Sequence, residues 1–142
     1  MSMKILLAAD GSKYTKKALA FLVANESVCG ADDELVVFNV QAAVPPRVKT
    51  MLGAAAVNDY HREEARKVLE PIERFLKRHD LRFRTAWAVG PATAELLAAA
   101  KREKSQLIVM GTHGHGIIGR ALMGSVAQRV VTDSPIPVLL VK

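Results

Sequence analysis

Leu107-Ile-Val-Met110 runs directly into Gly111-Thr-His-Gly114-His-Gly116-Ile-Ile-Gly119-Arg-Ala-Leu-Met-Gly124-Ser125. The first four residues are all apolar, which is typical of a strand covered by helices on both faces of a parallel sheet. Five of the nine glycines of the chain lie in the stretch that follows. Ser125–Thr132 is predicted to be a helix. The stretch therefore predicts a buried strand, a glycine-rich connection and a helix, the repeating unit of an α/β fold.

The same alternation extends through the rest of the chain. Short apolar runs predict further buried strands at Ile5–Ala9, Leu35–Val40 and Val138–Val141. Apolar residues three or four apart predict helices at Lys13–Asn25, Asn58–His79 and Thr93–Lys101. Between Arg82 and Val89, larger residues alternate with two arginines around Trp87, which predicts a strand buried on one face at a sheet edge. We expect one α/β domain over residues 1–142, a doubly wound five-stranded parallel sheet with helices on both faces.

The composition is that of an ordinary soluble globule, with 142 residues, 50% of them hydrophobic and 24% charged. No apolar run approaches the roughly 18–20 residues of a membrane span. The apolar run Ile5–Ala9 is too short for the core of a secretory signal. Cys29 is the single cysteine, so no internal disulfide forms, and a buried or incidental thiol is expected there. These features favour a cytoplasmic protein with no membrane partner.

A net charge of +6 and a pI of about 9.7 raise the question of a polyanionic partner. Many of the basic residues, however, lie between Arg62 and Arg84, interleaved with acidic ones, and aromatic residues make up only 5% of the chain. The pattern offers no platforms for stacking bases. It favours a solvated charged helix over a nucleic-acid interface, and we expect His61 and His79 on that helix to be solvated. A small phosphorylated ligand fits the charge as well.

Two features interrupt the regular pattern. The connection Gln41–Val57, with Pro45-Pro46 and Gly53, is longer than usual for this kind of fold. It is interpreted as a lid over a ligand, as a disordered segment or as an extended start to the next helix. Pro71 falls inside a helical pattern, where it removes a backbone donor and is expected to kink the helix.

The glycine-rich stretch predicts phosphate binding. Glycines there let the backbone approach an anion and take positive φ, so that successive N–H groups form a nest. Gly124-Ser125 opens a helix, whose first turn has unpaired N–H groups and a partial positive charge. Ser125 either caps that helix or donates to a phosphate oxygen.

The sequence lacks the more specific nucleotide-binding and catalytic motifs. Gly114-His-Gly116-Ile-Ile-Gly119 has the G-x-G-x-x-G form, but the following strand ends at Lys142 without the acidic residue of a dinucleotide site. The chain contains neither the G-x-x-x-x-G-K-[ST] of a P-loop nor the G-x-S-x-G of an esterase.

Polar side chains near the ends of the predicted strands are further candidates. Asp10 follows the first strand, where it either accepts a hydrogen bond from a ribose hydroxyl or braces the Gly11-Ser12 turn. His113 and His115 have no evident third metal ligand, so a neutral loop histidine or a phosphate contact is favoured over a metal site.

These residues resemble a known family. Gly111-x2-Gly114-x9-Gly124-Ser125 matches the G-x2-G-x9-G-[S/T] pattern of the ATP-binding universal stress proteins. Its flanks are also similar: Lys4-Ile-Leu-Leu-Ala-Ala-Asp10-Gly-Ser at the start, and Ser134-Pro-Ile-Pro-Val-Leu-Leu-Val at the end. The resemblance covers residues 2–142. Asn39 departs from it, because many relatives carry His there.

The resemblance implies a strand order of 3-2-1-4-5, with the reversal at Asp10 and Gly111. It implies that ATP binds with adenine near Val40, ribose near Asp10 and Gly111, and phosphates on Gly114, Gly124 and Ser125, often with Mg²⁺ or Mn²⁺. The full set of expected cofactor-binding residues is Ala9, Asp10, Val40, Met110, Gly111, Thr112, Gly114, His115, Gly124, Ser125 and Val126. It also implies a homodimer through the last strand, Val138–Val141.

The function that follows is a nucleotide-dependent regulatory or stress-response protein with an unidentified protein partner. No catalytic residue is predicted, because phosphoryl transfer needs a positioned water and a charge clamp, and only Arg120 and a bound metal would contribute to one. Slow ATP hydrolysis, or a dimeric chaperone-like protein that does not use nucleotide, are the alternatives.

Overall fold

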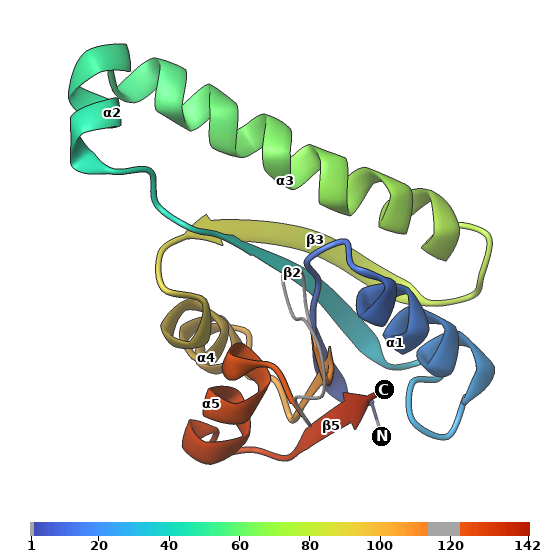
Figure 1. Ribbon diagram of the computed structural model, residues 1–142. Helices are drawn as coiled ribbons and strands as arrows, with labels where there is room; N and C mark the ends of the chain where they lie inside the picture. Colours follow the sequence, from blue (N-terminus) through green and yellow to red (C-terminus); the bar gives the residue numbers. More distant parts are fainter. Residues whose placement is uncertain (1, 114–122) are drawn as a thin grey trace.

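The computed structural model describes residues 2–113 and 123–142 of the chain. In this part of the chain, five parallel strands form one sheet in the order β3-β2-β1-β4-β5 (Figure 1). The strands are β1 (Lys4–Ala8), β2 (Glu34–Gln41), β3 (Arg82–Val89), β4 (Leu107–Gly111) and β5 (Val138–Val141). The strand order confirms the prediction, and β3 lies at an edge of the sheet as the alternation around Trp87 indicates.

Helices cover both faces of the sheet (Figure 1). One face packs against α1 (Lys13–Ala24) and α3 (Ala54–Leu76), and the other against α4 (Ala92–Arg102) and α5 (Ser125–Asp133). The side chain of Ser12 caps α1 by accepting from the backbone N–H of Thr15 at 3.4 Å. A serine at this position satisfies one of the unpaired N–H groups of the first turn.

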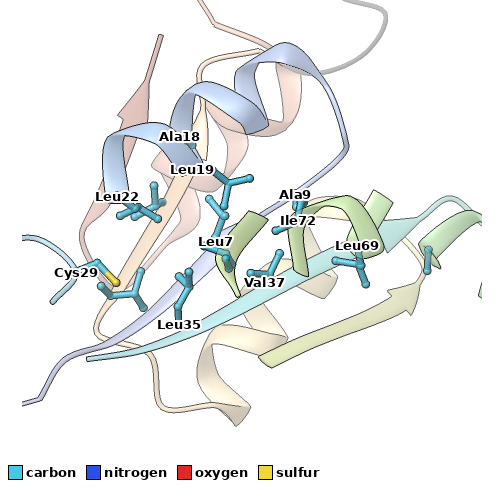
Figure 2. Packing of buried hydrophobic residues seen from close by; sticks show 14 residues of the cluster. Leu7, Ala9, Ala18, Leu19, Leu22, Cys29, Leu35, Val37, Leu69 and Ile72 are labelled. Atoms are coloured by element: carbon cyan, nitrogen blue, oxygen red, sulfur yellow. The ribbon is translucent and has the colours of Figure 1, made fainter. Parts of the chain in front are cut away.

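The core has two parts because successive side chains of a strand point to opposite faces. Leu6 and Leu7 of β1 are both fully buried, yet Leu7 packs in the cluster under α1 and α3, and Leu6 in the cluster under α4 and α5. Figure 2 shows the first cluster, in which Cys29 is also buried. Burial, with a smaller contribution from Asp33, raises the pKa of the Cys29 thiol to about 11.

The connection Gln41–Val57 is mostly helical, and of its three interpretations the extended start to the next helix agrees with the structure. A short helix, α2 (Pro46–Leu52), fills much of it, and α3 begins already at Ala54. Proline at the first helical position has its φ preset and lacks an N–H that would have had no partner there. Gly53 ends α2 with φ 87°, a left-handed conformation that glycine adopts without strain.

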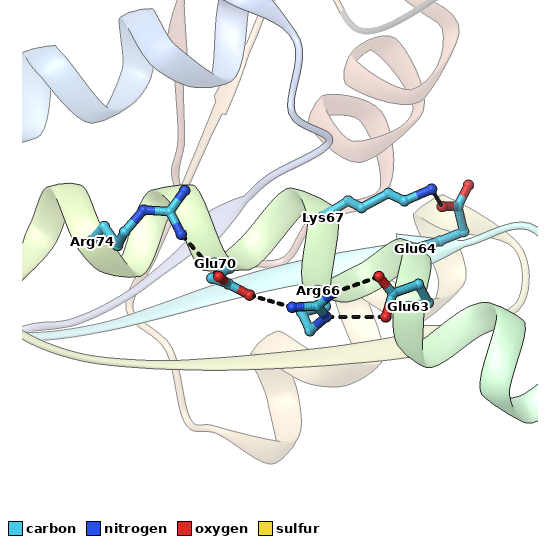
Figure 3. A network of polar contacts seen from close by, with 6 residues as sticks. All are labelled: Glu63, Glu64, Arg66, Lys67, Glu70 and Arg74. Carbon is cyan, nitrogen blue, oxygen red and sulfur yellow. Dashed lines mark hydrogen bonds and ion pairs between the residues drawn. The ribbon is translucent and has the colours of Figure 1, made fainter.

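Helix α3 runs unbroken through Pro71, which lies on its exposed side. Charged side chains along this exposed side pair with one another (Figure 3). Arg66 bonds Glu63 at 2.6 Å and Glu70 at 2.9 Å, and Lys67 bonds Glu64 at 2.8 Å. Such exposed pairs add little stability each. They explain the interleaved charges of the sequence without a nucleic-acid partner.

His61 differs from the prediction, because it is buried rather than solvated. Its side chain is 4% exposed, its Nδ1 has no hydrogen-bond partner in the described structure, and its ring lies edge-on to Tyr60 at 5.2 Å. His61 falls four residues after Val57 and four before Ala65, both buried, so it belongs to the apolar stripe of α3. His79 is exposed, as expected.

Among the described residues, no helix is both long and apolar enough to cross a membrane.

Candidate functional site

A cavity of about 460 Å³ opens at the carboxyl ends of β1, β2 and β4. It lies where the strand order reverses, the usual position of ligands in open α/β sheets. Eight of the predicted cofactor-binding residues line it: Ala9, Asp10, Val40, Met110, Gly111, Gly124, Ser125 and Val126. The structure therefore brings together residues that are up to 117 positions apart in sequence, from position 9 to position 126.

Three further predicted residues do not line the cavity in the described structure. Thr112 is buried behind it, where its backbone N–H donates to Val141 at 3.0 Å and its carbonyl accepts from Gly124 N–H at 2.7 Å. Thr112 thus ties the end of β4 to β5 and to the start of α5. Gly114 and His115 lie outside the described residues.

Asp10 braces the turn that leads into α1. Its Oδ1 accepts from the backbone N–H of Ser12 at 2.9 Å and from the Thr15 hydroxyl at 2.8 Å. The Thr15 oxygen in turn accepts from the Asp10 backbone N–H at 3.1 Å. Of the two interpretations of Asp10, the turn brace is the one observed. Because Asp10 also lines the cavity, the brace holds its carboxylate at the edge of the site.

Gly111 is explained by packing and not by unusual backbone angles. The positive φ expected of the glycine-rich stretch is absent at Gly111 and at Gly124, whose φ is −69°. A Cβ added to Gly111 would lie 2.4 Å from Cβ of Tyr14, far inside contact distance. Only glycine therefore lets the end of β4 approach α1 so closely.

The start of α5 forms one wall of the cavity. Gly124 is the N-cap residue and Ser125 is the first helical residue, so the expectation that Ser125 caps the helix is wrong. The first intrahelical bond runs from Gln128 N–H to Gly124 carbonyl at 3.0 Å, which leaves the N–H groups of Ser125, Val126 and Ala127 without partners inside the helix. These amides, together with the positive end of the helix dipole, suit an anion.

The apolar wall opposite was not predicted. Phe38, Leu96 and Ala92 line the cavity from β2 and α4, and Ala42 lines it just beyond the end of β2. A signal was available for Phe38, because residues two apart on a strand share a face, and Val40 was already a candidate. No such signal exists for Leu96 and Ala92, which reach the site only through tertiary packing.

His113 and Asn39 organise the surroundings of the cavity. His113 lines it, shares a hydrogen bond with the Thr112 hydroxyl through Nδ1 at 2.8 Å, and lies 5.0 Å from the Tyr14 ring. Asn39 is buried, donates to the Ala9 carbonyl at 2.9 Å, and so binds β2 to the end of β1.

The charges of the site are few. Asp10 is the only carboxylate among the described lining residues, and no Lys or Arg is found among them. No group of three His, Cys, Asp or Glu side chains able to hold a metal ion is found in residues 2–113 and 123–142. A bound anion would therefore be held in this part of the site by backbone amides and not by side-chain cations.

Comparisons with known proteins place this geometry in a family. The chain is 36% identical to the "universal stress protein in QAH/OAS sulfhydrylase 3'region" of Thermus aquaticus, with both chains fully covered. Among solved structures it is similar to protein MJ0577 of Methanocaldococcus jannaschii, with a TM-score of 0.82, 26% identity, and 99% and 95% of the two chains covered.

A second solved structure, the universal stress protein from Archaeoglobus fulgidus in complex with dAMP, shows the same fold, with a TM-score of 0.68, 20% identity, and 99% and 98% coverage. The model of the universal stress protein family matches residues 1–142. With the fold, the glycine spacing and a relative similar over its whole length in agreement, this chain belongs to the universal stress protein family.

Proposed function

We propose that this protein binds ATP in the cavity at the carboxyl ends of the strands, and that it acts as a nucleotide-dependent regulatory protein with little or no hydrolysis. One observation carries the proposal most directly. Amides of the α5 first turn that have no partner inside the helix and an apolar slot under Val40 and Phe38 face the same cavity, whose volume of about 460 Å³ suits a small-molecule ligand.

Each part of the nucleotide has a counterpart in this arrangement. The adenine ring packs on the apolar wall at Val40 and Phe38, and the ribose lies at Asp10 and Gly111. The phosphates lie at the amides of Ser125 and Val126, because the Gly124 N–H already donates to Thr112. We also assign Gly114 and His115 to the phosphates. Both lie outside the described residues.

A divalent ion fits this site as a companion of the phosphates. Mg²⁺ is usually held by one or two carboxylates together with phosphate oxygens and waters. Asp10 is the only carboxylate of the described lining, and its Oδ1 already accepts two hydrogen bonds. Mg²⁺ or Mn²⁺ would therefore enter with ATP and neutralise phosphate charge that no lysine or arginine of the described lining meets.

The chemistry of the site favours binding over turnover. Hydrolysis needs a group that positions a water molecule and a cation that stabilises the transition state. Among the described lining residues the candidates are committed elsewhere, because Asp10 braces the α1 turn and His113 is bonded to Thr112, while Arg120 lies outside the described residues. The dAMP complex of the Archaeoglobus fulgidus relative supports an adenine nucleotide as the ligand class.

Freshly purified protein should release ATP on denaturation, as detected by mass spectrometry, and emptied protein should bind ATP in calorimetry. Ala42→Trp should reduce the affinity at least tenfold, because the indole fills the mouth of the cavity. Ala43→Trp is the matched control, since Ala43 is equally exposed but does not line the cavity. Equal ATP affinity in both variants would place the nucleotide elsewhere.

We further infer a cytoplasmic homodimer formed through β5. In the described structure β5 pairs with β4 on one side and has no strand on the other, so its outer backbone groups can template a second copy. The carbonyls of Pro137 and Val141 accept from β4 and the residue after it. Since such bonds alternate along a strand, the backbone groups of Leu140 face outward.

Leu140→Pro should convert the dimer to a folded monomer, because proline removes an outward-facing N–H and is tolerated at an edge position. Sedimentation velocity measures the oligomeric state and circular dichroism checks the fold. A variant that stays dimeric would exclude β5 as the interface.

A further inference from the structure

A second cavity lies between α1 and α3, on the other face of the sheet. Its volume is about 460 Å³, comparable to that of the first cavity and within the range of small-molecule sites. Leu19 of α1 and Ile72 of α3, both buried, form its floor, and both are labelled in Figure 2. The half-buried side chains of Val68 and Phe75 also line it. We call this cavity the α1–α3 groove.

Pro71 is the least expected member of the groove. It is exposed and lies next in sequence to Glu70, on a helix whose outer side is otherwise charged. Proline inside a helix is destabilising, because it removes one hydrogen bond and crowds the preceding turn. Its ring does add apolar surface to the groove, where another residue of the charged side would not.

The groove has a definite charge. Among the described residues that line it, Lys16 and Lys67 are the only charged ones, and both are cationic. Lys67 pairs with Glu64 at 2.8 Å, whereas no ion pair of Lys16 is found in the described structure. At the other end of the groove, the Arg78 guanidinium lies 5.8 Å from the centre of the Phe75 ring.

The other lysines of α1 have a different environment. Lys13 and Lys17 lie over the Tyr14 ring, at 5.3 Å and 5.5 Å from its centre. Helix α1 carries three lysines and no acidic residue, although the positive end of a helix dipole disfavours cations in the first turn. Lys16 is thus a cation at the rim of an apolar groove, with no ion-pair partner in residues 2–113 and 123–142.

We propose that the α1–α3 groove is a binding site for an apolar monocarboxylate. The hydrocarbon part lies on Leu19, Ile72 and Pro71, and the carboxylate pairs with Lys16. From Lys67 to Phe75 the groove follows about 12 Å of α3, long enough for an extended chain of medium length. A polyanion would gain little binding energy from the apolar floor, and a cation would be repelled by Lys16.

The groove and the nucleotide cavity share one residue, Thr15, whose hydroxyl bonds Asp10 at 2.8 Å. Carboxylate binding does not depend on the proposed nucleotide function, so it is tested on nucleotide-free protein. A failure of ATP binding would therefore leave this test intact.

Decanoate is the probe, titrated into ¹⁵N-labelled full-length protein below its micellar concentration. The backbone amides of Leu19, Val68 and Ile72 should shift together and saturate. Decyltrimethylammonium, which has the same chain with the opposite charge, should give much weaker shifts. Equal shifts with both probes would reduce the groove to a nonspecific apolar surface and overturn the proposal.

Lys16→Ala should weaken decanoate binding about tenfold, which is the size expected when one charge-assisted hydrogen bond is lost. Lys17→Ala is the matched control, one residue away on the same helix and outside the groove. If the two variants lose affinity equally, general charge and not the groove would account for binding.

Ala20→Trp should abolish the shifts by filling the groove, while Ala24→Trp, equally exposed on the same helix but outside the groove, should not. Both positions are exposed, so both variants should fold, as their spectra will show. If Ala20→Trp alters the oligomeric state and wild-type protein does not bind decanoate, the groove is an interface with a second copy and the proposal is wrong.

Discussion

The two faces of the sheet are covered by helices of very different length. On one face α3 has 23 residues and α1 has 12, while on the other α4 has 11 and α5 has only 9. Within the described residues, 14 buried side chains lie under the long pair and 10 under the short pair. The cavity proposed for the nucleotide lies beside the short pair, at the carboxyl ends of the strands, where Phe38 and Leu96 line it.

The two faces of the sheet therefore have different roles. The face with the long helices closes over the sheet, and its remaining space is the α1–α3 groove near the surface. On the other face the starting turn of α5 lines the cavity proposed for the nucleotide. In the same sheet, therefore, one layer supplies most of the described core and the other supplies most of the site.

The largest expected effect comes from truncating the core on either face. Leu7→Ala and Leu6→Ala should each lower the free energy of unfolding by about 3 kcal/mol, because each leaves a cavity in a packed cluster. The double variant should lose about the sum if only side-chain packing matters, since the clusters share no member in the described structure, whereas coupling through the backbone shared by Leu6 and Leu7 would appear as a departure from the sum. Urea denaturation measures all three. A double variant that loses clearly more or less than the sum would show that the faces do not behave independently.

A smaller loss is expected where the two faces meet at Gly111. Gly111→Ala should cost about 1–3 kcal/mol, because its Cβ would overlap Tyr14 and force α1 away from β4. ATP affinity should fall too, since both Asp10 and Gly111 line the cavity. Gly53→Ala is a comparison and not a neutral control, because its Cβ would meet nothing within 4 Å but its φ of 87° strains an alanine, so its loss measures backbone strain without a clash. If Gly111→Ala changed neither the free energy of unfolding nor the ATP affinity, the contact between Gly111 and Tyr14 would have no role in the site.

The smallest effect concerns the amino ends of the strands, remote from both cavities. Asp33 accepts from the N–H groups of Gly30 at 2.8 Å and Met3 at 2.7 Å, and these bonds lower its pKa below the ordinary value of 3.8. Its contribution to stability is therefore complete above about pH 4 and is lost as the pH falls through the native pKa.

Replacing Asp33 by Asn should flatten the acid limb of the stability profile while leaving decanoate and ATP binding at pH 7 unchanged. Denaturation midpoints between pH 7 and about pH 3 measure this effect. A variant that loses stability in parallel with the wild type over that range would contradict the assignment.

Much of this architecture could be predicted from local patterns. Apolar runs located the strands, the alternation around Trp87 placed β3 at an edge, and the glycine spacing brought Gly111 and Gly124 to one cavity. The burial of His61 could also have been predicted, because it is spaced by four from both Val57 and Ala65. The charged residues around it hid that pattern.

Other features depend on contacts that no local pattern contains. Gly111 is required by Tyr14, which is 97 positions earlier in the chain and reaches it only after the sheet has formed. A cap on α5 was one of two interpretations of Ser125, but the N-cap residue is Gly124, whose N–H donates to the Thr112 carbonyl. The helix α2 has Pro46 and Gly53 at its ends, but none of its residues is buried. Its sequence therefore has no apolar periodicity from which a helix could be predicted.

The edge strand β3 also carries the only tryptophan of the chain, Trp87, which packs against the cluster under α1 and α3. Tryptophan fluorescence therefore reports on one layer of the protein and is insensitive to the other. The Trp87 emission should change when the α1–α3 side opens. It should not change when unfolding is confined to α4 and α5. A difference between fluorescence and circular dichroism during unfolding would then show which layer separates first.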